Sequence, residues 1–452
     1  MEKHLKHFIL MTIILCSCSS TKIVKTEKQN SNLFLTTLES ADVGKVSFYM
    51  DYTENNDNFE MFTKKNADIK LFGFLKAMGG RIFMNTMKNG SLINIKGVVK
   101  NDSLIGKLIS PLGSFDFISI KKKDSIVGKL MYQDKKIGTF SSILSKKRIK
   151  VRDYKKLIDK AIDITEYNIY NPNLVKTNDW NTFKKKIIKK AIYFEDDLEL
   201  ITYFFYASNK LPFSHFNILN KDYSSAKNKG EILYEKISDE TILLKIKNFN
   251  KNKDIIKSTI VNIIESNYKN LIIDLRSNRG GNIESALTLT SYLIEKPLYG
   301  GYFITQKWYK DNTDSIPNNI NTSGFPVFSK ANYNLLIEGI HKHKGLILKV
   351  NPADKYFNGK VFILTNNSTA STCEPIVYGL KINKRAIIIG EKTSGAMLSA
   401  EPFELFDNFK LFLPTADYYT SDGKRIDKIG VMPTFETESE NALKYVLDNL
   451  IE

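Results

Sequence analysis

Apolar and polar residues alternate in short runs through residues 33–143, and turn-forming residues separate the runs. Alternation with a period of two predicts β-strands that bury one face. The segment Asp102-Ser-Leu-Ile-Gly-Lys-Leu108 recurs as Asp124-Ser-Ile-Val-Gly-Lys-Leu130, 22 residues later. One up-and-down pair of strands per repeat accounts for that spacing. We therefore expect an antiparallel β domain over residues 33–146, folded as a meander sandwich or a partial barrel.

The pattern becomes helical over residues 147–210, where no glycine occurs. Five apolar residues at helical spacing form one stripe, namely Tyr154, Leu157, Ile158, Ala161 and Ile162. A stripe of this kind is typical of a helix that packs against a core. We expect a small helical domain of two to four helices.

Residues 211–452 have a mixed α/β pattern. The nearly continuous apolar run over 270–275 is typical of a parallel strand buried on both faces. Further strands are predicted over 241–246, 361–365, 386–389 and 409–413, and helices over 254–266, 282–293 and 439–450. Residues 298–360 have few regular signals, so we expect an insertion that overhangs the site as a lid.

The composition, with 42% hydrophobic and 25% charged residues in a chain of 452, is that of a globular protein. The formal net charge of +17 raises the question of an anionic partner. The lysines are spread along the chain, and no basic stripe with interleaved aromatic residues is present, so we expect no nucleic-acid partner. Proximity to a membrane is the next interpretation of the charge.

The first residues predict export. Lysines precede an apolar run over 8–15 that is too short to span a bilayer. Leu15-Cys16-Ser17-Cys18 resembles the lipobox of bacterial lipoproteins, which implies a signal peptide over 1–18 cleaved before Cys18, a lipid on Cys18 and a tether over 19–32. An ordinary secretory signal cut near Ser19 or Ser20 is the alternative. We expect an exported lipoprotein of the cell envelope, facing the periplasm or the cell surface, whose remaining Cys373 has no disulfide partner.

Two turns contain residues that could take part in catalysis. Residues 369–375 lie at a predicted strand-to-helix transition, where the Ser371 hydroxyl would lie beside backbone N–H groups. The alternative is that Ser371 only caps the helix. Gly280 and Gly281 follow the buried strand 270–275, where glycines let backbone N–H groups face a substrate carbonyl. Taken alone, they also fit a simple tight turn.

Residues 271–281 resemble the Asp-Leu-Arg-x-Asn-x-Gly-Gly signature of tail-specific, or C-terminal processing, proteases and of the tricorn core protease. Further motifs over 369–375, 390–393, 417–423 and 429–433 resemble those families in the same order, and the likeness covers 211–436. The resemblance implies a Clp/crotonase-like β/β/α spiral core with Ser371 as the nucleophile. It also implies an oxyanion hole made by the N–H groups of Thr372, Gly280 and Gly281, and no metal or cofactor.

The resemblance leaves two choices for the general base. The Ser-Lys branch places its lysine where this chain has Ala396, and Lys392 lies four residues too early. The tricorn-like branch uses a Ser-His pair, which implies His215 as the base. Ser214 and Asp427 would orient His215, although relatives usually carry Glu at the latter position. The short distance from His215 to the Asp-Leu-Arg strand implies that no PDZ-like module is present.

We therefore expect a serine peptidase that hydrolyses peptides or unfolded protein tails through an acyl-enzyme. The alternative is a catalytically inactive lipoprotein that kept the fold and binds a peptide or a partner. An acyl-CoA enzyme of the crotonase kind is a third interpretation, less favoured because export excludes the usual CoA pool.

Overall fold

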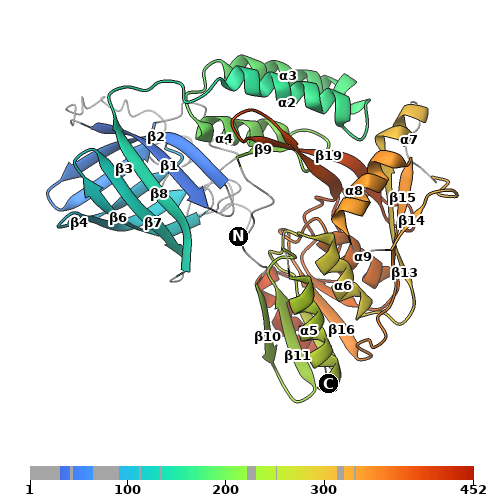
Figure 1. Ribbon diagram of the computed structural model, residues 1–452. Helices are drawn as coiled ribbons and strands as arrows, with labels where there is room; N and C mark the ends of the chain where they lie inside the picture. Colours follow the sequence, from blue (N-terminus) through green and yellow to red (C-terminus); the bar gives the residue numbers. More distant parts are fainter. Residues whose placement is uncertain are drawn as a thin grey trace, which may run out of the picture.

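The computed structural model (Figure 1) shows a β-barrel, a helical layer and a two-sheet α/β part. It describes residues 31–40, 44–64, 91–110, 113–132, 135–220, 231–250, 252–312, 320–329 and 332–451. The predicted signal peptide, Cys18 and nearly all of the predicted tether lie outside these residues. No helix in the described part of the chain is long and apolar enough to cross a bilayer.

The N-terminal strands form a closed barrel. The strands are β1 (Asn32–Ser40), β2 (Gly44–Asn55), β3 (Asn58–Thr63), β4 (Asn94–Lys100), β5 (Ser103–Ser110), β6 (Gly113–Lys122), β7 (Ser125–Tyr132) and β8 (Lys135–Ser145). Each strand pairs antiparallel with the next, and β8 pairs with β1. The predicted antiparallel meander is confirmed, but it closes completely. The repeated segments form β5 and β7, which are equivalent strands of successive hairpins.

Three α-helices follow the barrel in the chain, and the last of them lies beside it (Figure 1). They are α2 (Tyr154–Asn168), α3 (Asn178–Ala191) and α4 (Asp197–Ser208), with a short 3-10 turn, η2 (Leu174–Lys176), before α3. The stripe predicted on α2 is buried. At the start of α4, the carboxylates of Asp196 and Asp197 accept hydrogen bonds from the β2 backbone N–H groups of Tyr49 (3.2 Å) and Ser47 (2.9 Å). These buried carboxylates attach the barrel to the helical layer.

The first α/β sheet has the strand order β10-β11-β12-β16-β17-β20. Its strands are β10 (Ile232–Lys236), β11 (Thr241–Ile246), β12 (Asn270–Asp274), β16 (Lys360–Thr365), β17 (Ile387–Gly390) and β20 (Phe435–Glu436). All pair in parallel except the antiparallel edge strand β10. One face packs on α5 (Lys253–Glu265), α6 (Ile283–Ser291) and α9 (Cys373–Ile382), and the other on α10 (Ala442–Asn449), which follows the 3-10 turn η3 (Ser439–Asn441). The parallel order brings the carboxyl ends of β12, β16 and β17 to one edge of the sheet.

The second sheet has the order β14-β15-β13-β19-β18, and the short β9 (Asn217–Leu219) also pairs with β19. Its strands are β13 (Leu298–Thr305), β14 (Val327–Phe328), β15 (Gly345–Val350), β18 (Leu398–Glu404) and β19 (Lys410–Tyr419). This sheet lies between α6 and α9 on one side and the helices α2, α3 and α4 on the other. Between His215 and β12, the described residues form β9, β10, β11 and α5 and contain no separate PDZ-like unit.

The prediction of an irregular lid over 298–360 is wrong for the residues that the structure describes. This segment forms β13, α7 (Gln306–Asp311), β14, α8 (Tyr333–Lys342) and β15, and β13 lies inside the sheet between β15 and β19. Both faces of β13 are covered, so nearly all of its side chains are buried. A strand buried on both faces lacks the alternating pattern of a half-buried strand, and the glycine and tyrosine residues of β13 also interrupt the continuous apolar run by which β12 was recognised.

Candidate active site

Three turns meet at the carboxyl ends of β12, β16 and β17, where open α/β sheets commonly place their sites. The buried Asn278, in the turn after β12, contacts the turn after β16. Its side-chain Nδ2 donates to the Ile246 carbonyl (2.9 Å), and its Oδ1 accepts from the Gly280 N–H (2.8 Å). Its own carbonyl accepts from the N–H of Ala370 (3.0 Å), in the turn after β16. Asn278 therefore fixes the glycine turn against the Ser371 turn, a role that the sequence analysis did not assign.

Ser371 stands two residues before the first residue of α9, with a left-handed backbone (φ 57°). Non-glycine residues adopt this conformation at a cost that the surrounding structure must offset, and such residues cluster at functional sites. Here the Ser371 N–H is held by the Ala396 carbonyl (3.0 Å) and the Glu374 carboxylate (3.1 Å). The Ser371 Oγ lies 3.3 Å from the Nε2 of His215.

His215 also has a left-handed backbone, with φ 57°. The side chains of Phe213 and Phe216 on either side of it are buried, and Phe216 packs against aromatic residues of α3 and α4. The imidazole itself is only partly buried and points toward Ser371. The helical layer thus anchors the loop, while the imidazole remains available for chemistry.

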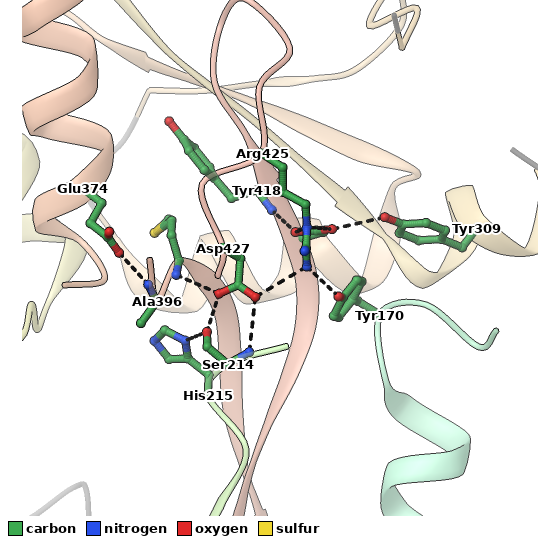
Figure 2. Close-up of polar contacts among 11 residues, drawn as sticks. Tyr170, Ser214, His215, Tyr309, Glu374, Ala396, Tyr418, Arg425 and Asp427 are labelled. Carbon is green, nitrogen blue, oxygen red and sulfur yellow. Dashed lines mark hydrogen bonds and ion pairs between the residues drawn. The ribbon is translucent and has the colours of Figure 1, made fainter. Parts of the chain in front are cut away.

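Ser214 connects His215 to Asp427 (Figure 2). Its Oγ lies 2.5 Å from Asp427 Oδ1 and 2.7 Å from His215 Nδ1, and its N–H donates to Asp427 Oδ2 at 3.2 Å. An ionised carboxylate only accepts hydrogen bonds, so the single Ser214 hydroxyl proton goes to Asp427. The Ser214 oxygen then accepts a hydrogen bond from Nδ1–H of His215. This tautomer leaves the Nε2 lone pair facing the Ser371 hydroxyl.

The electrostatics of His215 favour a neutral ring. Burial lowers the pKa of His215, and Lys428 lowers it further, whereas the negative charge of Asp427 raises it. Asp427 is fully buried, and the Met397 N–H (3.1 Å) and Arg425 Nη2 (3.4 Å) also donate to it. His215 is thus suited to accept a proton near neutral pH.

The buried Glu374 holds the turn after β17 against the Ser371 turn. In addition to the Ser371 N–H, its carboxylate accepts hydrogen bonds from the Thr393 hydroxyl (2.6 Å) and from the N–H groups of Gly395 (2.7 Å) and Ala396 (2.9 Å). Burial nevertheless raises the pKa of Glu374. From the sequence, Glu374 was expected only to lie in the first turn of a helix. The one available signal was an acidic residue among small residues three positions after Ser371.

Arg425 links the site to the helical layer (Figure 2). Its Nε donates to both carboxylate oxygens of Asp417 (3.0 and 3.2 Å), and its Nη2 donates to the Tyr170 hydroxyl (3.0 Å) and to Asp427. The hydroxyl of Tyr309 also donates to Asp417 at 3.2 Å. Burial raises the pKa of Asp417 to about 6, although Arg425 acts in the opposite direction. One guanidinium therefore balances two buried carboxylates.

The turn at Gly280 requires one correction to the predicted oxyanion hole. The Gly280 N–H is already bonded to Asn278, so it is not an available donor. Within the described residues, the N–H groups of Thr372 and Gly281 have no intramolecular acceptor. Gly280 is needed for another reason, because a Cβ there would lie 2.7 Å from the Cβ of Ser371.

Comparisons with known proteins identify a peptidase family over part of the chain. The model of peptidase family S41 matches residues 240–437. These residues form a peptidase S41 domain. The family comprises serine-type hydrolases and includes the carboxyl-terminal processing proteases.

Curated relatives match over parts of the chain. The chain is 25% identical over 191 residues to the chloroplastic carboxyl-terminal-processing peptidase 2 of Arabidopsis thaliana, covering 42% of this chain and 30% of that protein. It is 39% identical over 71 residues to the carboxyl-terminal-processing protease of Synechocystis sp., covering 16% of this chain and 17% of the relative. Among solved structures, a lipoprotein from Streptococcus agalactiae has 18% identity and a TM-score of 0.45, covering 67% of this chain and 98% of that one. The matched segments span less than a third of the length of these curated relatives.

The two candidate lysine positions in the S41 domain differ in their surroundings. Ala396 contributes only its backbone, which holds Ser371 and Glu374. Lys392 is exposed, and in the described part of the chain it makes no hydrogen bond to Ser371 or His215. No three His, Cys, Asp or Glu side chains among the described residues are placed to hold a metal ion.

Proposed function

We propose that the chain is a serine peptidase of the Ser-His type, with Ser371 as nucleophile and His215 as general base. The observation that carries the proposal is the continuous chain of contacts from Asp427 through Ser214 and His215 to the Ser371 hydroxyl. Hydrogen-bond reach between a nucleophile, a base and an orienting group is the geometric signature of covalent catalysis.

The mechanism follows from these positions. Nε2 of His215 takes the Ser371 proton as Oγ attacks the substrate carbonyl carbon. The oxyanion accepts hydrogen bonds from the N–H groups of Thr372 and Gly281. As the C–N bond breaks, His215 returns the proton to the leaving amine, and water then attacks the acyl-enzyme with the same base. Asp427 and Ser214 hold the tautomer of His215 and stabilise the imidazolium ion.

We also propose the finer features of the fold, the substrate and the location. The parallel sheet and the second sheet on either side of α6 and α9 fit a Clp/crotonase-like spiral core. The family supports peptides or unfolded protein tails as substrates. The lipobox-like segment ending at Cys18 supports an exported lipoprotein anchored in the cell envelope.

A fluorophosphonate probe tests the proposal, because it reacts only with an activated serine. The wild-type protein should become labelled, and Ser371→Ala should not. His215→Ala should label at least 10³-fold more slowly, since residues of one catalytic unit fail together, while Lys392→Ala, a matched control, should label at the wild-type rate. Absence of labelling in the folded wild type would favour a non-catalytic binding protein, and loss of labelling in Lys392→Ala alone would favour a Ser-Lys pair.

A further inference from the structure

The outer face of the barrel carries aliphatic side chains that nothing covers in the described part of the chain. They belong to strands β4 to β8, and their exposed fractions lie between 37% and 65%. These residues, which we call the apolar stripe, are Val98, Ile105, Ile118, Ile120, Val127 and Ile143. The barrel interior is filled by a separate set of side chains that includes Leu104, Phe117 and Ile126. The stripe therefore contributes nothing to the barrel core.

Strand register makes the stripe continuous. Val98 pairs with Ile105, and Ile105 pairs with Ile118 on the next strand. Ile120, two residues further along β6, pairs with Val127. Directly paired side chains on one face of a sheet are in contact, and diagonal neighbours are within reach of long side chains. The stripe thus crosses the barrel diagonally and ends at Ile143, which pairs with Ser125.

Lysines surround the stripe on the same face. Lys96 and Lys107 form the row beside Val98 and Ile105, while Lys100, Lys122 and Lys129 lie at the other margins. Lys96 and Lys107 are paired with Glu60 (3.1 Å) and Asp116 (2.9 Å). Lys100, Lys122 and Lys129 form no ion pair within the residues described. Residues 94–145 contain nine lysines against four aspartates and no glutamate or arginine, so this side of the barrel is basic.

Among the described residues, the stripe faces away from the helical layer. The barrel is attached to the helical layer through β2, where Ser47 and Tyr49 donate to the carboxylates at the start of α4. Figure 1 places β4, β6 and β7 on the side of the barrel remote from α4. A partner could therefore reach the stripe without displacing any described contact.

The chain enters the barrel beside one end of the stripe. β1 begins at Asn32, and Leu35 on this strand pairs with Ile143. The fourteen or so residues that separate Asn32 from the predicted lipid-bearing Cys18 extend to at most about 50 Å. An anchor at Cys18 would therefore keep this face within reach of the bilayer.

We infer that the apolar stripe and its lysine margin dock on the surface of an anionic bilayer. Aliphatic side chains bind at the depth of the headgroups, and lysines beside them are attracted to lipid phosphates. The positive charge of the lysine margin favours a membrane over a protein partner, because a protein partner of equal apolarity would not by itself require a basic margin. Docking places the barrel between the membrane and the peptidase part.

Vesicle partitioning tests this inference on the full chain with Cys16→Ser and Cys18→Ser, which cannot be acylated at those positions. All samples share the same N-terminal segment, so differences between variants report on the barrel. Binding to vesicles of phosphatidylcholine with phosphatidylglycerol should exceed binding to phosphatidylcholine alone. Replacing Lys100, Lys122 and Lys129 by Gln should weaken it about 100-fold, at about five-fold per lysine.

The matched control carries the same charge change on α3, as Lys185→Gln, Lys186→Gln and Lys189→Gln, and should bind like the parent. A second variant, Ile120→Ser with Val127→Ser, should weaken binding at least ten-fold without lowering the melting temperature. If the barrel and α3 lysine variants bind alike and the Ile120/Val127 variant binds like the parent, the inference is wrong.

In the chain with Cys16→Ser and Cys18→Ser, a fluorophore attached at Ile120→Cys identifies the docking face directly, because the remaining Cys373 is buried. Its emission should shift to the blue when anionic vesicles are added, whereas a fluorophore at Lys186→Cys should not respond. Equal responses at the two sites would overturn the inference. So would a shift at residue 120 that grows with protein concentration without vesicles, which would show that two copies associate through this face.

Discussion

Replacing Arg425 by Gln should destabilise the fold, because this guanidinium is the one cation that contacts both Asp417 and Asp427 in the described part of the chain. Its side chain is 27% exposed, and the two carboxylates are almost fully buried. Breaking a buried ion pair from one side typically costs about 3–5 kcal/mol, since a charge is left without compensation. We expect a loss of this size at pH 8.

The loss should depend on pH with a defined sign. Burial raises the pKa of Asp417 to about 6, above its unfolded value. The stability of the protein therefore falls as pH rises toward 6, and the cost of burying this carboxyl is largest above that pH. Without Arg425 the pKa of Asp417 rises further, and the carboxyl stays protonated to higher pH. The stability difference between wild type and variant should then grow between pH 6 and pH 8. One proton limits this growth to about 1.4 kcal/mol per pH unit.

Urea unfolding at pH 5.5, 7 and 8 measures this difference. The double variant Arg425→Gln with Asp417→Asn removes the titrating group, and its difference from Asp417→Asn alone should vary little with pH. Tyr170→Phe, which removes only the hydroxyl that accepts from Arg425, should cost less than Arg425→Gln. A pH-independent loss in Arg425→Gln, or a loss below about 1 kcal/mol at pH 8, would refute the electrostatic account.

Four further predictions concern the site, the barrel junction and the anchor. The kcat/KM for peptide hydrolysis should rise with pH to a midpoint below the ordinary histidine value, since burial lowers the pKa of His215 and the base acts when neutral. Gly280→Ala should slow fluorophosphonate labelling by about 100-fold. The added Cβ would clash with Ser371, and alanine would be strained at the φ of 89°, so the turn that carries the nucleophile would be displaced. Burial raises the pKa of Asp196 to about 7, so the stability of the wild type should fall as pH rises toward 7. Denaturation at pH 5 and pH 8 should show a smaller fall in Asp196→Asn. Labelling with a fatty-acid probe should be lost in Cys18→Ala and kept in Cys16→Ala; equal labelling of both would reject the anchor assignment.

The elements with a clear period could be predicted from local sequence. The alternation over 33–143 and the repeat at residues 102 and 124 indicated strands that the structure contains. The continuous apolar run at 270–275 indicated the buried parallel strand β12. The same reasoning failed at β13, because burial on both faces and a sequence of aromatic and glycine residues removed the signal.

The sequence by itself determined which residues were candidates for the site, since Ser371 lies in a recognisable motif and the resemblance assigns His215 and Asp427 by their order around the motifs. Only the tertiary structure decided how they connect. Ser214 contacts a carboxylate 213 positions away, and the contact between His215 and Ser371 spans 156 positions. The sequence also contained no sign that the Gly280 N–H donates to Asn278, or that Glu374 accepts hydrogen bonds from four donors. Hydrogen bonds depend on direction and distances of about 3 Å, and these are set by the packing of strands and turns that no local pattern specifies.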